Sequence, residues 1–271
     1  IGNDAPGLAS QALLLMCKAE QARGNIAAAL DLGVRSSVYA QEANVAEQHH
    51  SALEMATILA DLGVHRRALE YLSKIPANND LSERDRMRMA MALAACYMAK
   101  EDLDRATAQY EKGLQLATRE KDANTVVNCL SALASIEARR NAYLKAVGHE
   151  EDLLQVQRST GTSVDQGIVL NNLGELNEKL GKRDVAISYY LEAATLLYGE
   201  PEAHEQVLLN LAITYGNQGQ MAKAYKVLDN VLDLIRKHGT RKHLAAAHNM
   251  RAELYLSDKK HTEAQDEALK G

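Results

Sequence analysis

The feature that most constrains this chain of 271 residues is an internal pattern that recurs seven times. In its best copy, Leu173 directly precedes the small Gly174, the turn residue Gly181 follows seven residues later, and Ala186 stands five residues further on. A joint match of this kind at near-constant spacing predicts a repeat protein rather than one large globular core. The closing alanines, spaced 38 to 40 residues apart, are Ala29, Ala68, Ala106, Ala146, Ala186, Ala224 and Ala264.

Each copy predicts a pair of helices. Leu170, Leu173 and Leu180 fall on one helix face. The small residue after Leu173 lets a second helix approach, and the turn residue tolerates the left-handed conformation that ends a helix. The closing alanine then faces the first helix, where a bulky side chain would push the two apart. We predict an all-α fold of about seven antiparallel helix pairs, without strands, as one array over residues 1–271.

The predicted helix bounds follow from the same register. The expected first helices are 8–22, 46–62, 81–99, 123–139, 164–180, 203–217 and 242–257. The expected second helices are 26–43, 66–75, 103–119, 143–159, 183–198, 221–237 and 261–271. Capping boxes are predicted at Asp80 with Glu83 and at Ser163 with Gln166.

Composition excludes several classes of protein. The chain has no Trp and no Phe, which suits many small Ala and Leu contacts better than one large core. Its net charge of −5 argues against a protein that binds the phosphate backbone of nucleic acids. The sequence contains no run of 18 apolar residues, so it predicts no membrane span. The three cysteines are interpreted as reduced core residues. Because the chain starts at Ile1 rather than Met and stops mid-pattern at Gly271, we expect a fragment of a longer protein.

The stretch VLNNLGELNEKLGKRDVAISYYLEAATLL (residues 169–197) resembles a tetratricopeptide repeat, with Gly174, Gly181, Ala186, Tyr190 and Ala193 at the motif's positions. The resemblance extends over nearly the whole chain as seven units. The motif's leading Trp is absent, and the period exceeds the usual 34 residues. That longer form resembles the repeats of kinesin light chains and of bacterial regulators. The resemblance implies an α–α superhelix whose first helices line a groove.

Helix geometry, at 100° per residue, selects the stripe of each first helix that lies opposite its packed side. In the fifth and sixth units Asn172 and Asn210 repeat at the same offset, and a ladder of such amides can satisfy the backbone of an extended peptide. The resemblance to kinesin-type repeats implies the same use. The predicted peptide-binding groove residues are Arg88, Asn128, Ser135, Arg139, Asn172, Glu175, Lys179, Asn210, Ile213 and Asn217.

Other constellations are interpreted as structural. His49-His50 and the pair His243 and His248 lack metal-ligand spacing and are expected to be solvated. The basic run at 236–243 is interpreted as a solvated connector. Glu150-Glu151 is expected on a helix exterior. No catalytic motif appears, and we expect no metal or cofactor.

These observations predict a non-catalytic module that binds a protein or peptide. We expect it to be the sensory or scaffolding region of a larger, cytoplasmic, bacterial signalling or transcription-regulatory protein that contacts neither nucleic acid nor membrane. The alternative is a peptide-pheromone-type receptor domain switched by a small peptide, and a third hypothesis is an enzyme hidden in the fold. Self-association through the exposed terminal repeat is also expected.

Overall fold

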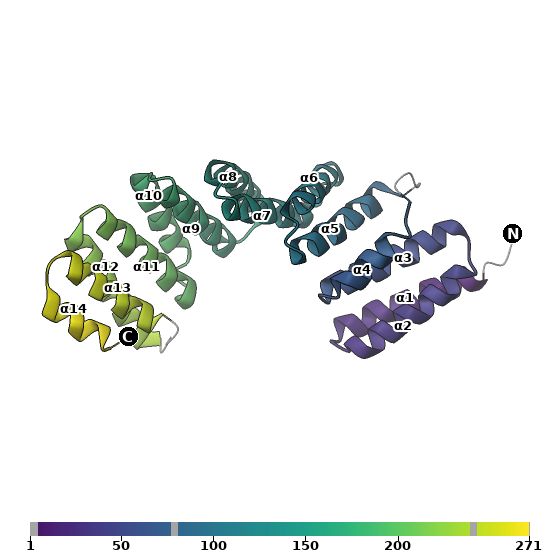
Figure 1. Cartoon of the computed structure of the whole chain (residues 1–271), viewed down its shortest axis with the longest axis horizontal. Helices are drawn as coiled ribbons and strands as arrows, with labels where there is room; N and C mark the ends of the chain where they lie inside the picture. Colours follow the sequence, from purple (N-terminus) through teal and green to yellow (C-terminus); the bar gives the residue numbers. More distant parts are fainter. Residues whose placement is uncertain (1–4, 77–80, 239–242, 271) are drawn as a thin grey trace. The chain divides into compact units, whose positions relative to one another are not determined.

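The computed structural model describes residues 5–76, 81–238 and 243–270. These residues form 14 α-helices and contain no strand, so the all-α prediction is confirmed (Figure 1). The helices follow one another as seven pairs, each joined by a short turn, as the repeat predicts. None of the described helices is long and apolar enough to cross a membrane.

The chain divides into two compact units, residues Ile1–Cys129 and Leu130–Gly271, and the boundary lies within α7. The first unit contains α1 (Ala5–Ala22), α2 (Ile26–Gln41), α3 (Val45–Asp61), α4 (His65–Leu72), α5 (Glu83–Ala99), α6 (Leu103–Glu120) and the start of α7 (Ala123–Arg139). The second contains the rest of α7, α8 (Tyr143–Thr160), α9 (Ser163–Lys179), α10 (Arg183–Leu196), α11 (Pro201–Asn217), α12 (Met221–His238), α13 (Leu244–Ser257) and α14 (His261–Ala268). A single array over 1–271 stays a prediction.

Neighbouring pairs stack within each unit. In the first unit α2 packs on α3, and α4 packs on α5. In the second unit α8 packs on α9, α10 on α11, and α12 on α13. A helix pair of this size cannot bury its apolar face alone, so this stacking between neighbours stabilises each unit.

The turn that joins the two helices of each pair has the left-handed conformation that the pattern predicts. Gly24, Gly63, Gly181 and Gly219 have φ angles between 74° and 77°. The three copies without glycine place Glu101, Asn141 and Lys259 in the same region, with φ of 58° or 59°. The turn geometry is therefore kept even where a side chain makes it costly.

The closing alanines form the contact between the two helices of each pair. All seven are at most 3% exposed, which confirms their predicted place. The small residue of the motif serves the same contact. A Cβ on Gly174 would lie 2.4 Å from the ring of Tyr190, which is itself only 1% exposed. The absence of a side chain at Gly174 is therefore what admits the Tyr190 ring.

Both predicted capping boxes are misplaced. Helix α5 begins at Glu83 and is capped by Ser82, whose hydroxyl accepts the backbone N–H of Asp85, while Asp80 lies outside the described residues. Helix α9 has its capping box one residue earlier than predicted, at Thr162 and Asp165. The Thr162 hydroxyl accepts the Asp165 N–H, and the Asp165 carboxylate accepts the Thr162 N–H.

Candidate functional site

A hollow of about 430 Å³ opens in the second unit and is lined by residues of α7, α8 and α9. Its volume falls within the usual range for small-ligand sites, roughly 300–1,000 Å³. Hydroxyl, amide and charged groups mix with small apolar side chains around it. The lining residues are Ser131, Ala134, Ser135, Ala138, Tyr143, Glu150, Asn172, Glu175, Leu176 and Lys179.

The space exists because one face of α7 carries only small side chains. Ser131, Ala134, Ser135 and Ala138 are spaced i, i+3, i+4 and i+7, so they share that face. The structure places these four around one hollow.

The deepest polar group of the hollow is Glu150 of α8, which is 5% exposed. It stands four residues after the closing Ala146. At the same offset the neighbouring repeats carry Tyr190 and Leu228, which are 1% and 0% exposed. A carboxyl thus occupies a core position that usually holds a large apolar side chain. The prediction of Glu150 on a helix exterior is wrong, because that position faces the first helix of its pair.

The two oxygens of Glu150 have different surroundings. Oε1 accepts a hydrogen bond from Nδ2 of Asn172 at 3.2 Å. Oε2 is buried and has no hydrogen-bond partner among the described residues. Burial raises the pKa of Glu150 to about 7, and the nearby charge of Glu175 adds to the rise, while the Asn172 hydrogen bond opposes it. Glu150 therefore changes charge near neutral pH.

The structure brings four of the predicted groove residues together around this hollow. They are Ser135 on α7 and Asn172, Glu175 and Lys179 on α9. The sequence analysis did not select Glu150 as a site residue. The sequence contains a signal that could have identified it, because Glu150 is a charged residue at the repeat position that Tyr190 and Leu228 occupy in the next two repeats.

Three further predicted residues lie on α11 of the same unit, outside the hollow. Nδ2 of Asn210 donates to Oδ1 of Asn171 at 3.0 Å and to Oε1 of Glu175 at 2.8 Å. Nδ2 of Asn217 donates to Oε1 of Glu178 at 2.7 Å, and Ile213 is 37% exposed. Asn210 and Asn172 thus have different partners, and their joint role in a peptide ladder stays a prediction.

The other predicted residues lie elsewhere. Arg88 and Asn128 belong to the first unit, and Arg139 ends α7 in the second. Nη1 of Arg88 donates a hydrogen bond to Oε1 of Glu54. The Glu54 side chain is 2% exposed, and its Oε2 also pairs with Nζ of Lys18 at 2.7 Å. Burial alone would raise the pKa of Glu54, but the hydrogen bonds from Arg88 and Lys18 outweigh it and lower the pKa to about 2. Arg88 thus stabilises an internal carboxylate.

Two of the histidines expected to be solvated are buried. Nδ1 of His243 lies 3.2 Å from Oε2 of Glu205, and both residues are largely excluded from solvent. Nδ1 of His248 lies 2.7 Å from Oε2 of Glu267. The interpretation of residues 236–243 as a solvated connector is therefore wrong at His243, while residues 239–242 of that run lie outside the described part of the chain.

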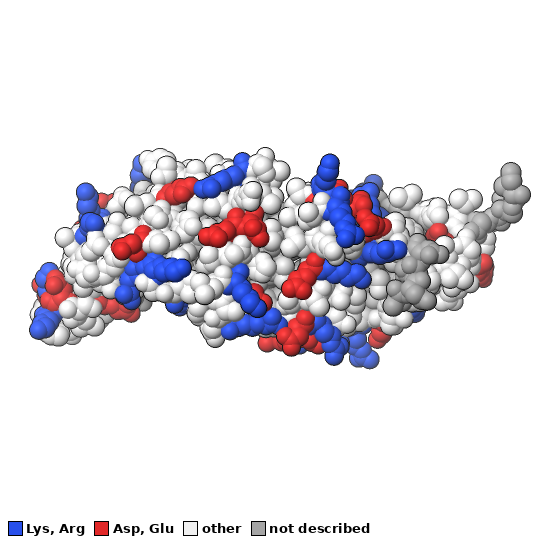
Figure 2. All heavy atoms as spheres, turned by 90° about the horizontal axis from the view of Figure 1, so that it is seen from above, with Lys and Arg blue, Asp and Glu red and all other residues white. Residues whose placement is uncertain are grey.

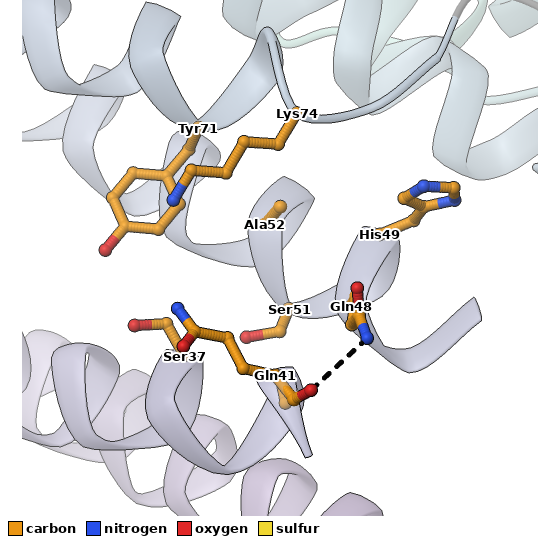
Figure 3. A pocket seen from close by; sticks show the side chains of 9 residues that line it. Ser37, Gln41, Gln48, His49, Ser51, Ala52, Tyr71 and Lys74 are labelled. Atoms are coloured by element: carbon orange, nitrogen blue, oxygen red, sulfur yellow. Dashed lines mark hydrogen bonds between the residues drawn. The ribbon is translucent and has the colours of Figure 1, made fainter. Parts of the chain in front are cut away.

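A second hollow, of about 110 Å³, lies in the first unit between α2, α3 and α4. Figure 3 shows the amide side chains of Gln41 and Gln48 near its edge, with Nε2 of Gln48 donating to the carbonyl oxygen of Gln41 at 3.4 Å. On the other side the Lys74 ammonium lies 4.5 Å from the centre of the Tyr71 ring. This hollow is well below the volume of ordinary ligand sites.

The surface charges do not favour a partner of one particular charge. Figure 2 shows acidic and basic side chains interspersed on the face that it presents. Of the described residues, no three histidine, cysteine, aspartate or glutamate side chains come together as a metal site.

Comparison with known proteins identifies the repeats. Residues 169–196 and 205–238 match the tetratricopeptide repeat family model. These segments comprise most of the pairs α9–α10 and α11–α12, and they are tetratricopeptide repeats. The other described helix pairs follow the same architecture, so the predicted resemblance is confirmed. No curated protein sequence matches the chain significantly.

Solved structures show the same fold at low sequence identity. A signal transduction ATPase with numerous domains and a tetratricopeptide repeat sensor, from Pyrococcus horikoshii, is 18% identical with a TM-score of 0.65; the match covers 95% of this chain and 40% of that one. The kinesin light chain-like repeats of Podosopora anserina are 18% identical with a TM-score of 0.57, covering 71% of this chain and 97% of that one. Aspartyl phosphate phosphatase F from Bacillus subtilis is 12% identical with a TM-score of 0.62, covering 100% and 94%.

These likenesses show the fold, an all-α array of tetratricopeptide-type helix pairs. The chain spans about 40% of the length of the Pyrococcus protein.

Proposed function

We propose that the chain is a non-catalytic module that binds an extended polypeptide along α7 and α9 of the second unit. The observation that carries the proposal is the hollow between these helices, where Ser135, Asn172 and Lys179 offer donors and Glu175 an acceptor beside small apolar side chains. An extended peptide needs such a mixture, because its backbone requires hydrogen-bond partners and its side chains require space.

The wider role that we propose is the sensory or scaffolding region of a larger signalling or regulatory protein in the bacterial cytoplasm. The Pyrococcus protein carries a tetratricopeptide repeat sensor. That likeness supports a sensory role for a chain with this fold. A catalytic alternative is favoured only by the likeness to the Bacillus phosphatase. Assay of the chain for release of phosphate from an aspartyl phosphate substrate decides between them, since turnover would contradict the non-catalytic proposal.

The experiment that tests the binding site is selection from a random peptide display library against the immobilised chain. Affinities of enriched peptides are then compared for the unmodified chain and for Ser135→Arg, which puts a long side chain into the hollow. The matched control is Ser188→Arg, the same change at an exposed position of α10 in the same unit. We expect Ser135→Arg to weaken binding about tenfold or more and Ser188→Arg to leave it unchanged.

Equal binding by all three proteins would place the ligand elsewhere and contradict the proposed site.

The predicted amide ladder has its own test. The double change Asn172→Ala and Asn210→Ala is expected to weaken peptide capture without loss of helicity by circular dichroism. Unchanged affinity in that double variant would remove the ladder.

A further inference from the structure

The starting observation is that Glu150 fills a core position incompletely. In the next repeat the Tyr190 ring packs over Gly174 at a distance that leaves no room for a Cβ. In the fourth repeat the equivalent pair is Glu150 and Ala134, and both line the hollow. A shorter carboxyl side chain thus stands at the edge of the hollow, where the next repeat carries a ring.

The second observation is a buried oxygen of Glu150 that has no hydrogen-bond partner among the described residues. Glu150 is 5% exposed, and its Oε2 has no partner among the described residues, although Asn172 donates to Oε1. A buried carboxylate oxygen without a donor is destabilising, because it loses its water without replacement. A donor that reaches this carboxyl group would therefore favour its ionised form.

The charges around the hollow select the kind of donor. Glu175 of α9 acts on Glu150 as a like charge. Its own Oε1 is held by Nδ2 of Asn171 at 2.8 Å and Nδ2 of Asn210 at 2.8 Å. Lys179 also lines the hollow, one turn after Glu175 on α9. Ser131, Ser135 and Tyr143 add hydroxyl groups that can accept further hydrogen bonds.

We propose that this hollow accepts a cationic side chain, arginine or lysine, of the bound polypeptide, whose N–H groups donate to the carboxyl group of Glu150. The inference rests on the proposed function and names the residue type that the groove selects. An entering cation supplies the missing donor and compensates the two carboxylates. Arginine matches the site better than lysine, because its planar fork can donate to Glu150 and to a hydroxyl or to Glu175 at once.

One competing mode uses the same residue in the opposite protonation state. A protonated Glu150 would donate a hydrogen bond to a carbonyl group of the ligand. The two modes differ in their pH dependence. Binding of a cation strengthens as the pH rises through about 7, where Glu150 ionises, whereas binding of a carbonyl weakens over the same interval.

The test uses two small probes, N-acetyl-L-argininamide and its neutral isostere N-acetyl-L-citrullinamide. Binding to the full chain is followed by NMR, through the carboxyl carbon of Glu150 and the side-chain amide of Asn172. We expect the arginine probe to bind about tenfold or more tightly than the citrulline probe, to bind more tightly above neutral pH, and to lower the pKa of Glu150.

The variant Glu150→Gln keeps the shape of the side chain and removes its charge, and we expect it to lose the preference for the arginine probe. The control is Glu151→Gln, which removes a charge from the adjacent, exposed position of α8 and is expected to retain it. Equal binding of the two probes, or binding that strengthens below neutral pH, would overturn the proposal.

Failure of this inference and failure of the proposed function give different results. Enriched peptides that bind at Ser135 and contain no basic residue would overturn the cation pocket and leave the peptide groove standing. Binding of the arginine probe without capture of any peptide would overturn the peptide groove and support the pocket.

Discussion

Replacement of Glu150 by glutamine is expected to stabilise the folded chain, and more so as the pH rises. Folding lifts the pKa of this carboxyl from an ordinary 4.5 to about 7, so the folded state disfavours its ionised form. At about 1.4 kcal/mol per pKa unit, the cost once Glu150 is ionised is about 3 kcal/mol. The residue is 5% exposed, so solvent screens little of this energy.

The sign follows from proton binding. Below about pH 4.5 the carboxyl is protonated in both the folded and the unfolded chain, and the cost is absent. As the pH rises from there to about 7, the unfolded chain loses the proton first, and the contribution of Glu150 to stability falls. Glutamine keeps the acceptor for Asn172 and never ionises. The stability difference between Glu150→Gln and the unmodified chain should therefore widen by about 3 kcal/mol between about pH 4.5 and about pH 8.

The assay is urea unfolding followed by far-ultraviolet circular dichroism across this pH range. Taking the difference between two proteins cancels the titration of every other group that they share. Glu151→Gln serves as control, because Glu151 is exposed and adjacent on the same helix, and its difference should stay nearly constant with pH. Parallel pH curves for Glu150→Gln and the unmodified chain would refute the assignment of Glu150 as a buried, costly carboxyl.

Three further predictions concern packing, charge and turns. Gly174→Ala should destabilise the chain by about 1–3 kcal/mol in urea unfolding, because the new Cβ would displace the buried Tyr190 ring; unchanged stability would mean that the ring can move. Arg88→Met should cost about 3–5 kcal/mol near pH 7 by leaving Glu54 buried without its main partner, and the loss should shrink as the pH falls below about 4.5 towards 2, where Glu54 is protonated; a loss independent of pH would contradict this. Lys259→Gly should raise the thermal midpoint by relieving a left-handed residue, worth about 1 kcal/mol, whereas an unchanged or lower midpoint would show that the turn is not strained.

Much of the fold could be predicted from the sequence because its determinants are local. The closing alanines, the turn residues and the apolar spacing each act within one helix pair, so the period of 38 to 40 residues located all seven pairs. The helix ends were less predictable. Thr162 and Ser163 are both good N-caps, and only the backbone geometry decides that Thr162 takes that role.

The candidate site was predicted in part. Helix periodicity correctly placed Asn172, Glu175 and Lys179 on one face of α9. It treated every unit as equivalent, and so it assigned Asn210 the role of Asn172 although the two amides bond different partners. Hydrogen bonds of this kind depend on which residue of a neighbouring helix stands opposite, and periodicity does not specify that.

The sequence by itself determined the helix pairs, their left-handed turns and the small residues between them, because each of these follows from the geometry of a single helix or turn. Only the tertiary structure decided which polar groups are buried and which residues become their partners. Glu150 and His243 are residue types that usually lie on the surface, yet packing against other helices buries both side chains. Glu150 comes to line a hollow, and His243 comes to lie beside the carboxylate of Glu205. The physical reason is that desolvation and pairing depend on every neighbour at once, whereas helix formation depends on residues within a few positions along the chain.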